Sequence, residues 1–113
     1  MVLNDAALVV GSNAIDAAIT HMQAHSADPG ADGVGFEIGS RLAVNGSVDA
    51  DGDITWTAAF TGLGANAAFW GVSYWSASSG GTCYGTCARV GGDTTANAAG
   101  AYTYTGAENS TAS

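Results

Sequence analysis

Residues 69–90 read FWGVSYWSASSGGTCYGTCARV, and this stretch decides the fold class. Aromatic and branched residues alternate with small ones through 69–77, at the period of two that is typical of a strand. Serine and glycine at 78–81 supply the turn, and residues 82–90 return as the partner strand. The sequence therefore predicts an antiparallel β-hairpin here.

Similar alternation predicts strands at residues 18–26, 36–48, 54–58 and 101–105, the second of them open to interruption. Before them, residues 4–18 carry apolar side chains at helical spacing behind the N-cap residue Asn4, with Leu8, Ile15 and Ile19 on one face. Gly11 indicates close packing or a break in this helix, because a mid-helix glycine costs up to about 1 kcal/mol relative to alanine.

Together these elements predict a mainly β fold in one domain, residues 1–113. We expect an antiparallel, jelly-roll-like β-sandwich across residues 19–105, preceded by one N-terminal α-helix. Residues 106–113 are polar and are expected to form a tail.

Large aliphatic side chains are scarce in this chain. Leu, Ile, Val and Phe make up about a sixth of the 113 residues, and Ala and Gly about a third. The net charge of −8 adds self-repulsion. We therefore expect either a loose chain or one that is stabilised by burying surface against copies of itself and other proteins.

The charge balance excludes two classes of partner. With two arginines and no lysine, the chain lacks the cations that nucleic-acid phosphates require, and an anionic membrane surface would repel it.

The apolar stretches fall short of the roughly 20 residues of a spanning helix, and residues 1–5 lack the basic start of a signal peptide. The sequence predicts no nucleic-acid binding, no membrane insertion and synthesis in a cytoplasm.

His21 and His25 are four residues apart and share a face of the predicted strand. Since no third ligand is near them in the sequence, we interpret them as residues of a strand face or of a contact between subunits. A ring of copies meeting at that face would be the one route to a metal-binding or pH-sensing role.

Asp49, Asp51 and Asp53 resemble the opening of a calcium loop. Gly52, however, stands at the fourth position rather than the sixth, and Phe60 occupies the twelfth, where a glutamate is required. We therefore interpret these residues as an exposed acidic hairpin tip, and we expect no metal and no cofactor.

Catalytic patterns are missing from the sequence. It contains neither a nucleophile elbow nor a phosphate-binding loop. Glu37, Glu108 and eight aspartates are present, but nothing in the pattern places two of them across a cleft. We expect no enzymatic activity.

Cys83 and Cys87 are a candidate disulfide only if residues 84–86 turn tightly. Residues four apart in a strand are separated by about 13 Å, whereas a disulfide needs Cα atoms within about 7 Å. Gly85 permits such a turn, but two free, buried thiols are the favoured interpretation.

Tryptophan and tyrosine could stack on sugars, or they could fill a core that lacks aliphatic residues. We expect most of them in the core. The candidates for contact with a glycan or a partner are Trp70, Tyr74, Trp75 and Tyr84.

Two segments carry a family resemblance. HSADPG at residues 25–30 and YWSASSGGTCYG at residues 74–85 are similar to a His-Thr-Ala-Asp-Pro-Gly turn and a Trp-Ser-Ala-x-x-Gly-Gly-Thr-Phe-Tyr-Gly hairpin. Both belong to small, mycobacteriophage-like virion proteins of actinobacterial tailed phages, commonly labelled minor tail proteins. Residues 3–6, 41–44 and 101–103 extend the resemblance over most of the chain. Cys83 departs from it, standing where an aromatic residue is usual, and so does Cys87, where small or polar residues are common.

The resemblance implies a non-enzymatic virion structural subunit of the tail tip or a fibre. Such a subunit would be made in the host bacterial cytoplasm and would assemble symmetrically with copies of itself, a trimer among the options, and with other tail proteins. It could also touch the host surface. The alternatives are a capsid decoration or head-fibre protein and a carbohydrate-binding module that binds host cell-wall glycans.

Overall fold

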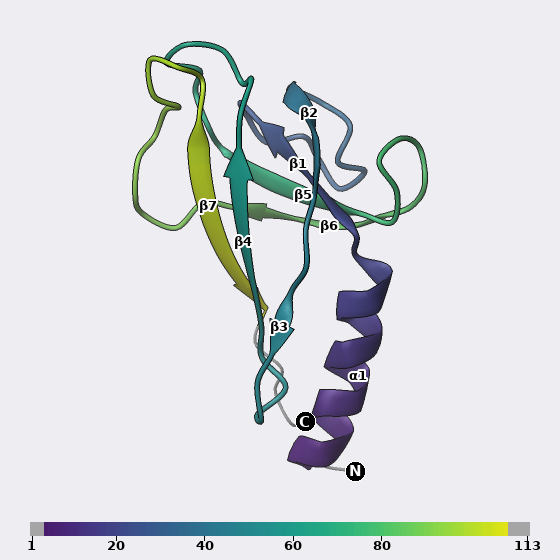
Figure 1. The fold of residues 1–113 in the computed structure, drawn as a ribbon. Coiled ribbons are helices and arrows are strands. Elements are labelled where there is room, and N and C mark those ends of the chain that lie inside the picture. The colour runs from purple at the N-terminus through teal and green to yellow at the C-terminus, as the bar shows by residue number, and fades with distance from the viewer. Residues whose placement is uncertain (1–3, 109–113) are drawn as a thin grey trace.

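The computed structural model describes residues 4–108, which form one helix and seven strands in two antiparallel sheets (Figure 1). The helix is α1 (Asp5–Ala18). One sheet has the order β2 (Glu37–Ala43), β1 (His21–His25), β5 (Gly71–Trp75), β6 (Cys83–Ala88). The other has the order β3 (Ser47–Val48), β4 (Ile54–Phe60), β7 (Tyr102–Glu108). The predicted mainly β fold, sandwich-like with one N-terminal helix, is confirmed.

Residues 36–48 are the segment where the chain changes sheets. The sequence predicts a strand there that is open to interruption, and the structure has two strands, β2 and β3, which belong to different sheets. Gly46 lies at the crossing and donates its N–H to Asp16 Oδ1 of α1 (2.9 Å). A Cβ on Gly46 would lie against that oxygen and 2.7 Å from Trp56 Nε1, so the backbone must pass close to the helix here.

Strand β7 is longer than the sequence predicts. It pairs with β4 along its whole length, from Tyr102 opposite Phe60 to Glu108 opposite Ile54. The expected polar tail at 106–113 is therefore wrong for residues 106–108, because β4 offers them a complete hydrogen-bonding partner. Residues 109–113 lie outside the described part of the chain.

The core between the sheets is built on the inward face of β4. Ile54, Trp56, Ala58 and Phe60 are buried and the residues between them are exposed, as the alternation predicts. Aromatic rings supply the volume that aliphatic residues do not. Phe69 stacks on Tyr102 with centroids 3.9 Å apart, and Trp56 contacts Tyr74 at 5.2 Å. Trp56 and Tyr104 belong to the core, and Tyr74 and Tyr102 pack against it, so most of the tryptophan and tyrosine rings lie in or against the core as expected.

Helix α1 runs beside the β3–β4 hairpin (Figure 1). Asn4 Oδ1 accepts the Ala7 N–H (3.0 Å), as expected for the N-cap. The buried hydroxyl of Ser12 donates to the Gly52 carbonyl of the hairpin. The helix continues through Gly11, where a Cβ would meet nothing within 4 Å, so both reasons expected for this glycine are wrong.

Strand β1 is buried on both faces. Met22 and Ala24 lie in the hydrophobic core, while Gln23 and His25 are also almost completely covered. Gln23 Nε2 donates to the carbonyls of Ile38 (3.0 Å) and Gly39 (3.2 Å), beside an irregularity in the β1–β2 pairing. Residues 26–36 lie over His25, so the alternation in 18–26 does not leave one face open.

Candidate functional site

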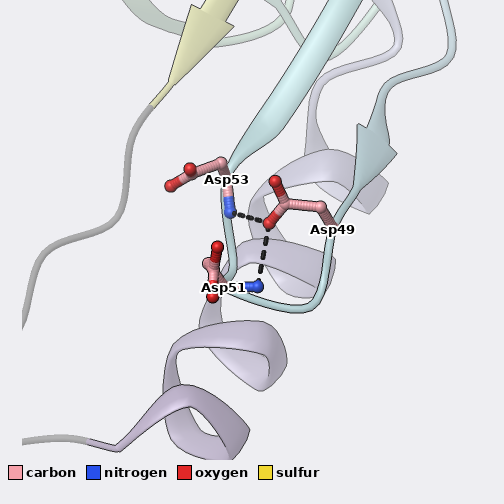
Figure 2. Close-up of side chains that lie close together, drawn as sticks. All are labelled: Asp49, Asp51 and Asp53. Atoms are coloured by element: carbon pink, nitrogen blue, oxygen red, sulfur yellow. Dashed lines mark hydrogen bonds between the residues drawn. The ribbon is translucent and has the colours of Figure 1, made fainter.

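The predicted hairpin tip places Asp49, Asp51 and Asp53 together. Their nearest ligand oxygens all lie within 4.8 Å of one another. Figure 2 shows the reason: Asp49 Oδ1 accepts the backbone N–H groups of Asp51 (2.9 Å) and Asp53 (3.0 Å). Turn geometry thus accounts for the cluster, and its first carboxylate already binds two amides.

The two histidines do not form one site. His21 is half-buried, with Nδ1 2.8 Å from Thr20 Oγ1. His25 is completely buried inside this chain, which corrects the expectation that it faces a neighbouring subunit. Burial lowers the pKa of His25 below its ordinary value of 6.5, against smaller opposite effects of a hydrogen bond with Gly35 and the charge of Glu37.

The two cysteines are free thiols, so the candidate disulfide is wrong. Pairing of β5 with β6 shifts between Tyr74 and Trp75, which separates the surroundings of the two cysteines. Cys83 lies against Gly33 of the covering loop, whereas Cys87 packs on the hydrophobic core. Both are only partly buried.

The four aromatic candidates occupy different surroundings. Trp75 is 6% exposed, and Arg41 covers its ring with Cζ 3.7 Å from the centroid. Trp70 and Tyr74 are half-buried, while Tyr84 is 53% exposed. Tyr74 and Tyr84 share an apolar groove that Trp70 and Trp75 do not reach.

This groove separates α1 from strands β5 and β6. It has a volume of about 540 Å³, within the usual range of ligand pockets. Its lining combines four helical or helix-capping residues with three aromatic rings and two residues of β6: Ala14, Ile15, Ala18, Ile19, Trp56, Tyr74, Tyr84, Gly85 and Thr86.

A second, more polar hollow of about 740 Å³ lies among the loops around residues 92–103. Two of its polar side chains, those of Asn97 and Tyr102, form hydrogen bonds within the loops. Asn97 Oδ1 accepts the N–H groups of Ala99 and Ala101, and the Tyr102 hydroxyl donates to the Asp93 carbonyl.

The solvent side of α1 is largely apolar, which we did not predict; Asn13 is an exposed polar residue beside it. We call this apolar surface the α1 face; it consists of Ala6, Ala7, Val10, Gly11, Ala14, Ile15 and Ala17, all exposed or partly exposed. Val10 is 71% exposed and Ile15 is 44% exposed. The opposite side carries the buried Ser12 and the hydrogen-bonded Asp16.

This polarity is the reverse of an ordinary surface helix, which turns charged residues to water. The signal was present in the sequence, because α1 contains only two charged residues, Asp5 and Asp16. Apolar residues occur on most sides of the helix, so the sequence pattern alone does not show which of them pack against the sheets.

Comparison with family models, curated proteins and solved structures finds no match for this chain. Within residues 4–108, no helix has the length and apolar character needed to cross a bilayer.

Proposed function

We propose that this chain is a non-enzymatic structural subunit of the virion of a tailed phage, a minor tail protein that works by assembling with copies of itself. The observation that carries the assembly part is the α1 face, an apolar surface on a helix whose polar side chains Ser12 and Asp16 point inward. The virion part rests on the resemblance of residues 25–30 and 74–85 to small tail proteins.

Covering the α1 face would be favourable. Burying a valine or isoleucine side chain completely contributes about 1.5–3 kcal/mol, and Val10 is mostly and Ile15 partly uncovered. Gly11 and the alanines allow a second backbone to approach closely, which would give Gly11 the packing partner it lacks among the described residues.

The small area of the α1 face limits the strength of this contact. A helix of 14 residues is about 21 Å long and about 10 Å wide, so the α1 face covers roughly 210 Å² per copy. Two copies that meet through this face alone bury less than the lower limit of about 1,000 Å² for a specific interface, so the contact is weak. Such pairing depends on concentration, and the high local concentration of subunits in a particle would favour it.

Charge also favours this surface for contact between copies. The chain has a net charge of −8, and its two arginines bind backbone carbonyls: Arg41 binds Ala77 and Gly80, and Arg89 binds Phe69. The α1 face carries no charge, so copies can meet there without bringing carboxylates together.

Helix orientation distinguishes two assemblies. The acidic tip lies near the N-terminal half of α1, since Gly52 packs on Leu8. Antiparallel helices in a dimer keep two tips apart, whereas parallel helices in a trimer bring three together. Added salt should strengthen the parallel assembly much more than the antiparallel one, because it screens repulsion between the tips.

The test of the virion role uses particles of the phage that encodes this chain, labelled with an antibody against the recombinant protein and viewed by electron microscopy. Label on the tail supports the proposal, and label on the capsid favours the decoration alternative. A chain found in infected cells but missing from purified particles would contradict both.

The same phage carrying Val10→Lys should assemble poorly, because the substitution places a charge on the α1 face. Val90→Lys is the matched control, since Val90 is 97% exposed and lies outside the face. Equal particle yields for both variants would contradict the role of α1.

A glycan-binding module is a second candidate, favoured by Tyr74 and Tyr84 in the groove. It predicts that cell-wall binding is lost in Tyr84→Ala and retained in Val90→Lys. Binding that instead depends on Trp75 is not expected, because Arg41 covers that ring.

A further inference from the structure

Residues 26–36 form a loop that covers the outer side of β1 and β5. Pro29 and Gly33 of this loop are buried. A Cβ on Gly33 would lie 2.7 Å from Cys83 Sγ and 3.1 Å from Ser73 Cβ, so the loop backbone is seated directly on the sheet.

The ring of His25 joins this loop to the sheet through two hydrogen bonds, one at each nitrogen. Its Nδ1 lies 2.6 Å from the Gly35 carbonyl, which can only accept, so Nδ1 carries the hydrogen. Its Nε2 lies 2.7 Å from Ser73 Oγ, and Trp75 Nε1 donates to the same oxygen at 2.7 Å. The hydroxyl hydrogen of Ser73 can then be donated to Nε2 of the neutral imidazole, which gives every group in this network a partner. Protonation of Nε2 would take away the acceptor of the Ser73 hydroxyl hydrogen.

We propose that His25 is a proton-sensitive latch, whose protonation at Nε2 releases loop 26–36 from the sheet. The proton comes from water and forms an N–H bond where Nε2 previously accepted the Ser73 hydroxyl. Ser73 Oγ would then face two donors, Nε2–H and Trp75 Nε1–H, while its own hydrogen would lack its acceptor. The inference does not depend on a virion role.

The charged and titratable groups around the latch come from β2, β6 and the loop itself. Glu37 on β2 is paired with His25 and favours the protonated form. Cys83 on β6 lies against Gly33, and Arg41 covers the ring of Trp75. In the loop itself, the carboxylates of Asp28 and Asp32 accept the N–H groups of Gly30 and Val34.

Burial outweighs these effects and lowers the pKa of His25. A released loop returns the imidazole to water and to its ordinary pKa of about 6.5. The released state therefore binds a proton more readily than the closed state. The latch is fully closed above pH 6.5 and weakens as the pH falls below it.

The backbone conformation of Phe36 in this loop also favours release. Val34 and Phe36, on either side of Gly35, are 55% and 62% exposed. Phe36 has a φ of +56°, a strained conformation for a bulky residue, so opening would relieve strain there. The loop thus has a closed and a released state, and the charge of His25 determines which of them is favoured.

The test is NMR of the full chain from pH 7.5 to pH 4.5, with hydrogen exchange measured at two sites. These are the Ser26 N–H, which donates to the Phe36 carbonyl (2.9 Å), and Trp75 Nε1–H. After correction for the intrinsic effect of pH, exchange at both should rise by up to about tenfold per pH unit below 6.5. Amides of β4, in the other sheet, should stay unchanged and so exclude global unfolding.

His25→Gln should remove the pH dependence, whereas His21→Gln should retain it. If His25→Gln does not fold, Ser73→Ala serves instead. It keeps the imidazole but removes the donor to Nε2, which narrows the difference in the pKa of His25 between the closed and released states, so the pH dependence of exchange should become weaker. Exchange in the wild type that stays flat to pH 4.5, or a pH dependence that persists in His25→Gln, would overturn the latch.

Discussion

At the scale of single residues, substitutions at two glycines allow the cost of backbone strain to be measured apart from the cost of steric overlap. Gly33 and Gly62 have φ values of +70° and +68°, but a Cβ added at Gly33 would have neighbours within 4 Å, whereas one added at Gly62 would not. Gly62→Ala should lower the free energy of unfolding by about 1 kcal/mol, the cost of a left-handed alanine. Gly33→Ala should lower it by about 2–4 kcal/mol, because overlap with Cys83 and Ser73 is added. Urea denaturation measures both, and equal losses would contradict the seating of loop 26–36.

Sequence reasoning at this scale placed the inward residues of β4 correctly but not the surroundings of His25. Alternation fixes which side of a strand a residue faces, and it held for Ile54 and Trp56. It cannot show what covers that side. The partners of His25 are Gly35 and Ser73, and the second is 48 residues away in the sequence. The covering loop depends on long-range pairing that no local pattern records.

At the scale of elements, the contact between α1 and the β3–β4 hairpin includes one buried hydroxyl, that of Ser12. Ser12→Ala removes its hydrogen bond to the Gly52 carbonyl and should lower the free energy of unfolding by about 1–2 kcal/mol. Asn13→Ala, the neighbouring exposed position, should be neutral or slightly stabilising, because alanine is the better helix former. Thermal and urea unfolding of the two variants provide the comparison. A Ser12→Ala protein as stable as Asn13→Ala would show that the hairpin does not hold the helix.

The existence of the elements was predictable, whereas their assignment to sheets was not. The helix, the hairpin of β5 and β6 and the turn at the acidic tip follow from caps, alternation and turn residues. The change of sheet at Gly46 depends on the approach of Asp16 from α1, which is a tertiary contact. The apolar outer side of α1 was hidden for the same reason, since helical spacing gives a stripe but not the direction of the core.

At the scale of the whole molecule, the central proposal is that contact between copies through the α1 face stabilises the chain. Its scarcity of large aliphatic residues suggested this from the sequence, but composition could not locate the surface. Sedimentation velocity of the 11.1 kDa chain over a range of concentrations tests it directly. We predict reversible association at micromolar to millimolar concentrations, retained in Val90→Lys and abolished in Val10→Lys and Ile15→Lys. A wild-type chain that sediments as a monomer at all of these concentrations, or a Val10→Lys chain that still associates, would contradict the proposal.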